Sequence, residues 1–168
     1  MKKIVLLLLL TMFSFSAIGA NKGNVDTTLA RVSSEFNIES VKMDGSLFRM
    51  MMPLMGIDRK TRKAFKAMNI EEIIITDLKD ESEEIISKVI GDITGALEAD
   101  GYAKGPQQES ASETEAEEIK ADAFALVEEE IVRGLAILTY FPKAGFLCIR
   151  CSMKVSELEE IVNALMPE

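Results

Sequence analysis

The sequence IEEIIITDLKDESEEIISKVIGDITGALEADG, residues 70–101, contains the clearest strand and the clearest helix of the chain. Three consecutive isoleucines at 73–75 are β-branched and flanked by acids, which predicts a central strand over 70–78 that is buried in its middle. Asp80 and Glu83 resemble a capping box, and apolar residues then recur every three or four positions. They are Ile86, Val89, Ile90, Ile93, Ala96 and Leu97. We expect Gly101 to end this helix, since glycine readily adopts the left-handed conformation.

Shorter elements precede this unit. Helical spacing of four apolar residues predicts a first helix that ends at Phe36. These are Val25, Leu29, Val32 and Phe36. Alternation predicts a short strand over 38–44, after which Ser46 is expected to cap a short helix. Asp58 is expected to open a further helix over 58–68.

A change of composition follows the long helix. Residues 103–122 contain five glutamates and one large apolar side chain, which predicts a mobile acidic loop rather than a specific acidic recognition element. Strands are expected over 123–128, 135–141 and 146–153, and a turn at 142–145 joins the last two into a hairpin. A capping box at Ser156 and Glu159 predicts a closing helix.

The order of these elements indicates the fold class. Strands and helices alternate too irregularly for a doubly wound parallel sheet. We therefore predict an α+β fold, with a mostly antiparallel sheet, amphipathic helices packed on one face, and a closing β-hairpin plus C-terminal helix. Residues 21–168 are few enough to form a single domain.

The N-terminus has the pattern of a secretory signal peptide. Lys2 and Lys3 precede an apolar run of about a dozen residues, which is shorter than the roughly 20 that span a bilayer. Cleavage is expected after Gly19 or Ala20, so that residues 1–20 are the signal peptide and the mature form has no transmembrane span. The sequence predicts a periplasmic or secreted protein, and an uncleaved N-terminal tether is the alternative.

The charge of the chain limits its partners. Without Lys2 and Lys3 it has 17 basic and 28 acidic residues, a formal charge of −11. A nucleic acid would repel such a surface, so we expect no nucleic-acid partner. The chain has no histidine, only two cysteines and no phosphate-binding glycine loop. These absences predict a non-enzymatic protein without a cofactor or a metal site.

Several segments resemble an exported family of Gram-negative bacteria, the domain of unknown function 4252. They are the signal peptide, the first helix ending at Phe36, SLFRMMMP at 46–53, the isoleucines at 73–75, Gly101-Tyr102, and the closing hairpin and helix. The glutamate-rich insertion and the cysteines of the last strand depart from the family pattern. The resemblance implies an uncharacterised envelope protein linked to envelope stress or surface signalling, because family members are often encoded near extracytoplasmic sigma factors.

Sulfur-containing side chains suggest an alternative function. Cys148 and Cys151 form a C-x-x-C, which in an oxidising compartment suggests thiol redox chemistry. In a strand, however, residues three apart face opposite sides, so we expect two structural thiols, one buried and one facing outward. Methionines could bind copper(I), although consecutive ones point in different directions around a helix. They are Met43, Met50, Met51, Met52, Met55 and Met68.

A basic stripe is the last candidate. Arg59, Arg62, Lys63 and Lys66 fall on one face of the helix over 58–68, beside the methionine-bearing segment 47–55. We predict that Met50, Met51, Met55 and this basic stripe form a surface for an envelope protein or an anionic membrane. The alternative is a solvated face whose charge is balanced by nearby acids such as Glu71 and Glu72.

Overall fold

A computed structural model describes residues 24–105, 120–140 and 143–158. Its core is a six-stranded sheet of order β1-β2-β6-β5-β4-β3 in which all neighbours are antiparallel. The strands are β1 (Ser40–Asp44), β2 (Ile70–Asp77), β3 (Ala103–Lys104), β4 (Ala121–Glu128), β5 (Ile131–Thr139) and β6 (Gly145–Lys154). The predicted α+β class, with its mostly antiparallel sheet, is confirmed.

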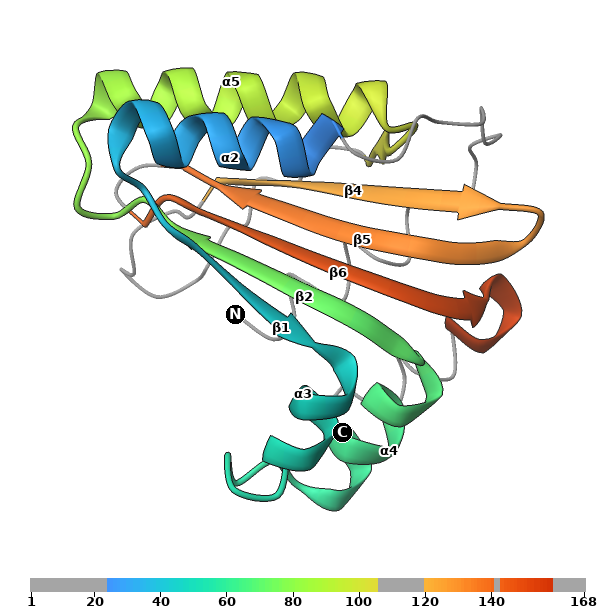
Figure 1. The fold of residues 1–168 in the computed structure, drawn as a ribbon. Helices are drawn as coiled ribbons and strands as arrows, with labels where there is room; N and C mark the ends of the chain where they lie inside the picture. The colour runs from blue at the N-terminus through green and yellow to red at the C-terminus, as the bar shows by residue number, and fades with distance from the viewer. Residues whose placement is uncertain (1–23, 106–119, 141–142, 159–168) are drawn as a thin grey trace, which may run out of the picture.

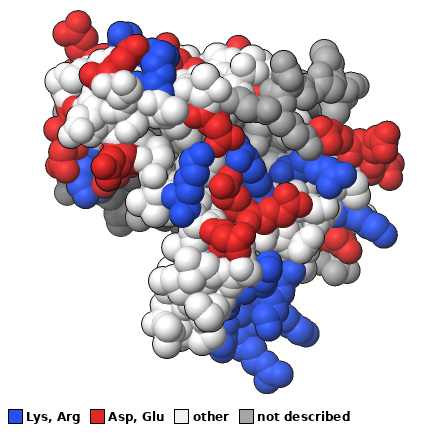
Figure 2. Space-filling model, in the orientation of Figure 1, with Lys and Arg blue, Asp and Glu red and all other residues white. Residues whose placement is uncertain are grey.

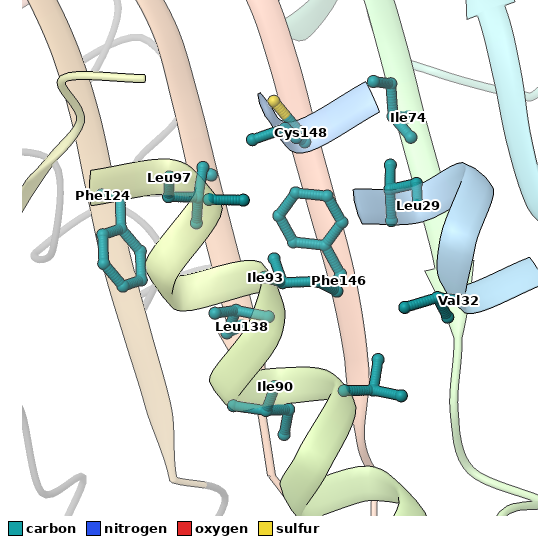
Figure 3. Packing of buried hydrophobic residues seen from close by; sticks show 14 of the residues in the cluster. Leu29, Val32, Ile74, Ile90, Ile93, Leu97, Phe124, Leu138, Phe146 and Cys148 are labelled. Carbon is teal, nitrogen blue, oxygen red and sulfur yellow. The ribbon is translucent and has the colours of Figure 1, made fainter. Parts of the chain in front are cut away.

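Two helices, α2 (Asn24–Phe36) and α5 (Glu83–Ala99), lie side by side on one face of this sheet (Figure 1). Every residue of the predicted apolar face of α5 is buried. In Figure 3, Ile93 and Leu97 of α5 and Leu29 of α2 surround Phe146 of β6. These side chains belong to the larger of two hydrophobic clusters, which fills the space between helices and sheet.

The other face of the sheet has a second cluster. Two short helices, α3 (Gly45–Met51) and α4 (Arg59–Ala67), project from the end of the sheet where β1 ends and β2 begins (Figure 1). Their buried residues join those of β4, β5 and β6 that point away from α5. In β4 successive side chains alternate between the two clusters, with Phe124 in the first and Ala123 in the second.

Several predicted boundaries are shifted. Ser82, not Asp80, caps α5, because its side chain accepts the N–H of Ile85. Asp44, not Ser46, caps α3 and accepts the N–H of Ser46. Of the three consecutive isoleucines at 73–75 in β2, only Ile75 is exposed. The end of α5 at Gly101, with φ 85°, is as predicted.

The acidic segment is bounded by strands. Residues 103–104 form β3 and residues 121–122 begin β4, so both ends of the predicted loop lie in the sheet. The central part of that predicted loop, residues 106–119, lies outside the described residues, as do the predicted cleavage site at Gly19 and Ala20 and most of the predicted closing helix. A helix begins at Val155 and is described as far as Leu158. Within the described ranges, no helix is long and apolar enough to span a membrane.

Candidate functional site

The α3–α4 tip, residues 45–67, is joined to the sheet mainly through α3. Phe48 and Met52 are buried in the second cluster, and the Phe48 ring packs edge-on against Phe65 with centroids 5.4 Å apart. The Arg49 guanidinium donates a 3.0 Å hydrogen bond to the carbonyl of Ile70. Gly45 lies so close to that carbonyl that a Cβ would be 1.8 Å from its oxygen. These contacts attach α3 to β2, and the Phe48–Phe65 ring pair joins α4 to α3.

Capping carboxylates define both helices of the tip. Asp44 caps α3, and Asp58 caps α4 by accepting the N–H of Thr61 at 2.9 Å. Hydrogen bonds from Ser46 and Thr61 lower the pKa of Asp44 and Asp58 respectively. The predicted start of α4 at Asp58 is confirmed.

Large apolar side chains are exposed on this tip. Leu54 is 86% exposed, Met50 69% and Met55 56%, and Leu47 is exposed beside them. Met52 is fully buried between these exposed neighbours. The predicted splay of consecutive methionines around a helix is thus confirmed. Copper(I) binding by the thioethers, the alternative that the sequence left open, is not tested by this geometry.

The basic stripe lies next to these apolar side chains. Arg59, Lys63 and Lys66 are exposed, whereas Arg62 is half-buried with its Nε atom inaccessible. In Figure 2 the projecting tip is uncharged over one half and blue over the other. The stripe and the methionine-bearing segment are therefore neighbours on one projection.

No ion pair joins the basic stripe, or Lys60 beside it, to any acid of the described residues. Glu72, one of the two acids expected to balance it, binds Arg150 instead. The described part of the chain thus leaves the charge of α4 uncompensated by ion pairs.

The two thiols are separated by the sheet. Cys148 and Cys151 are each only 1% exposed and unpaired, with Cys148 in the first cluster and Cys151 in the second. The expectation that one thiol faces outward is therefore wrong, because the second cluster, to which strands, α3, α4 and Leu158 all contribute, buries Cys151. Burial raises the pKa of Cys148 to about 11 and that of Cys151 to about 12. This geometry gives no support to a dithiol redox centre.

A cleft of about 270 Å³ beside the start of α2 was not foreseen from the sequence. Its lining includes Asp26, Glu71, Tyr102, Arg133 and Arg150. Arg150 lies between the carboxylates of Asp26 and Glu72, each 2.5 Å away. Asp26 is 124 residues from Arg150 in the sequence and Glu72 is 78 residues from it, so no local sequence pattern indicates these ion pairs.

The strands change register beside this cleft. The pairing of β2 with β6 shifts between Ile70 and Glu72, and that of β5 with β6 shifts between Val132 and Gly134. Such bulges bend strands and redirect side chains. Here the bulges lie beside the ion pairs that Arg150 forms with Asp26 and Glu72. The pair with Asp26 connects the start of α2 to β6. Among the described residues, no group of three or more Cys, Asp or Glu side chains is placed to hold a metal ion.

Comparisons with known proteins do not assign this chain to a family. The chain matches no protein-family model, no curated protein sequence and no solved structure. The resemblance to the domain of unknown function 4252 family stays a prediction.

Proposed function

We propose that this protein is exported to the cell envelope and acts there as a non-enzymatic interaction module that docks onto an anionic partner through the α3–α4 tip. The observation that supports this proposal is the set of cations on α4 that lack ion pairs among the described residues, next to exposed Leu54, Met50 and Met55. Adjacent apolar and charged groups of this kind are typical of interaction sites.

The contrast with the rest of the surface strengthens this proposal. Other described cations, such as Arg31, Lys42 and Lys104, form ion pairs with acids of this strongly acidic chain. Residues 45–67 contain six basic residues and one acid, a formal charge of +5, whereas the whole chain carries −9. An anionic partner would be attracted to the tip and repelled elsewhere. The resemblance to an exported family supports the envelope location, and its link to envelope stress or surface signalling stays a prediction.

Charge reversal on α4 tests the proposal. The variant Arg59→Glu, Lys60→Glu, Lys63→Glu, Lys66→Glu changes only exposed side chains and spares half-buried Arg62. Its co-sedimentation with a Gram-negative envelope fraction, measured at low and at moderate salt, should fall to background. Wild-type binding should weaken as salt rises, because ions screen exposed charges.

A matched control has the same change of net charge away from the tip. Lys79→Glu, Lys88→Glu, Lys120→Glu and Lys154→Glu alter four exposed lysines elsewhere. This control should bind the envelope fraction nearly as well as wild type. Equal losses in both variants would show that overall charge matters and that the tip is not the docking site.

A further inference from the structure

We infer that the anionic partner of the α3–α4 tip is a phospholipid bilayer, with Leu54 and Met55 inserted among the lipids and the cations of α4 on the headgroups. This inference rests on the proposed function and names its partner. Three observations support it: the shape of the tip, the positive charge of the tip on an otherwise acidic protein, and the absence of core contacts by the exposed apolar side chains of the tip.

The shape of the tip suits a fluid partner. Leu54 and Met55 lie in the turn between α3 and α4, where Gly56 has φ 67° and reverses the chain. Leu54 is 86% exposed and therefore stands clear of its neighbours. A folded protein would need a pocket matched to such a projection, whereas lipid chains adapt to any apolar shape. Segments that combine apolar side chains with Lys and Arg characteristically lie at the boundary between headgroups and acyl chains.

Charge would orient the protein on an anionic bilayer. The tip carries +5 within a chain of −9, so the remainder is strongly acidic. Figure 2 shows the blue side chains of α4 gathered at the projecting end without red ones among them, whereas red and blue side chains are interspersed over the rest of this face. The bilayer would attract the tip and repel the body. Each basic residue near such a surface strengthens binding about fivefold.

The exposed apolar residues have no part in holding the tip together. The tip contributes Phe48, Met52 and Ala64 to the second cluster, and all three are buried. Leu54, Met55 and Met50 point away from this cluster and are exposed. They can be replaced without removing core contacts, so loss of binding can be separated from loss of folding.

A single tryptophan reports on insertion, because the chain has none of its own. Leu54→Trp places it in the turn of the tip, and Ser87→Trp places it on the exposed side of α5 as a matched control. Both tryptophan variants are purified in the form that the host cell exports. Mass spectrometry then determines at which residue each purified chain begins. Vesicles of phosphatidylcholine alone are compared with vesicles that contain phosphatidylglycerol, with and without brominated acyl chains.

The inference predicts a specific pattern. Leu54→Trp emission should shift to the blue and be quenched by brominated lipid only on phosphatidylglycerol vesicles, while Ser87→Trp should show neither effect. The four-site α4 charge reversal should lower the partition coefficient at least about a hundredfold. Leu54→Ser should lower it about tenfold, the scale of burying one leucine.

Other results would overturn it, and they separate the two proposals. Unchanged Leu54→Trp emission on anionic vesicles, together with tip-dependent binding to the envelope fraction, would mean that the partner is not lipid and that the docking proposal alone survives. Envelope binding that is insensitive to the α4 charge reversal would remove both. Quenching of Leu54→Trp and Ser87→Trp alike would show non-specific adsorption and would also overturn the inference.

Discussion

Asp100, which follows α5, accepts hydrogen bonds from the backbone N–H groups of Asn24 at 3.1 Å and Val25 at 3.0 Å, in the first turn of α2. The first N–H groups of a helix have no partner within it, and a carboxylate at that end is favourable. The buried Asp100 at the end of α5 thus caps the start of α2, 76 residues earlier in the sequence.

Removing this carboxylate should loosen the helix layer. We expect Asp100→Ala to lower the free energy of unfolding by about 2 kcal/mol, the combined scale of a lost cap and of buried donors left unpaired. Urea denaturation followed by circular dichroism measures the change. Asp80→Ala, at an exposed turn position, is the control and should differ little from wild type. Equal losses would show that the cap contributes nothing specific.

Contacts of this kind mark the limit of prediction from the sequence. The apolar faces of α2 and α5 repeat every three or four residues, and the β5–β6 hairpin has its turn residues between two apolar runs, so local patterns were sufficient. Asp100 with Asn24, and Arg150 with Asp26, are brought together only by the packed fold. Exposure of Met50, Met55 and most of the basic stripe agrees with the surface predicted from their closeness in sequence, whereas Met51 and Arg62 are half-buried. Burial of Cys151 depends on the packing of the whole second cluster.

The β4–β5 turn was missed for a different reason. Glu129 and Glu130 connect the strands with φ values of 48° and 66°, a left-handed conformation that this kind of hairpin needs and that Asn and Gly usually provide. β5 therefore begins at Ile131, four residues before the predicted start.

Residues suited to that turn should stabilise the protein. Glu129→Asn with Glu130→Gly is expected to raise the free energy of unfolding by about 1 kcal/mol, because left-handed backbone is costly for glutamate. Thermal unfolding measures the gain. A lower melting temperature would show that the two glutamate side chains contribute more than the strain costs.

Gly134 and Tyr102 are in tight contact. A Cβ at Gly134 would lie 2.2 Å from the Tyr102 hydroxyl oxygen, and that hydroxyl lies 3.7 Å from the Cys148 sulfur. Gly134→Ala should therefore destabilise the protein by about 1–3 kcal/mol through overpacking.

Gly91→Ala is the matched substitution, since a Cβ at this exposed helix position meets no atom within 4 Å. It should stabilise the protein by about 0.5–1 kcal/mol, because alanine favours the helix. Chemical denaturation of both variants checks the opposite signs, and losses of similar size would contradict this account of the packing.

The buried thiols should be unreactive in the folded protein. With pKa values of about 11 and 12, Cys148 and Cys151 have very little thiolate at pH 8. We expect alkylation at least about a hundredfold slower than for a free cysteine, because the thiolate is the reactive form. Mass spectrometry after timed iodoacetamide treatment measures it, with a sample in denaturant as the control. Rapid labelling of the folded protein, or an intramolecular disulfide formed in air, would revive the redox alternative.

Asp26 should make stability depend on acid pH. Burial tends to raise its pKa, but hydrogen bonds from Lys42 and Arg150 and their charges outweigh burial and lower the pKa in the folded state. A carboxyl with a lowered folded pKa stabilises the fold above its unfolded pKa of about 4, and that contribution is lost as pH falls through the folded value.

The free energy of unfolding should therefore decline as pH falls below about 5, and Asp26→Asn should make that decline shallower. At pH 7 the same variant should lose about 1 kcal/mol, a modest figure because the cluster is partly open to solvent. Urea denaturation at a series of pH values measures both effects. In an Arg150→Met background, Asp26→Asn should change the pH dependence less, because one of the two cationic partners of Asp26 is gone. If Asp26→Asn retained the wild-type slope below pH 5, other carboxylates would carry the acid sensitivity, and the Asp26–Arg150 pair would hold α2 to the sheet without contributing to its pH response.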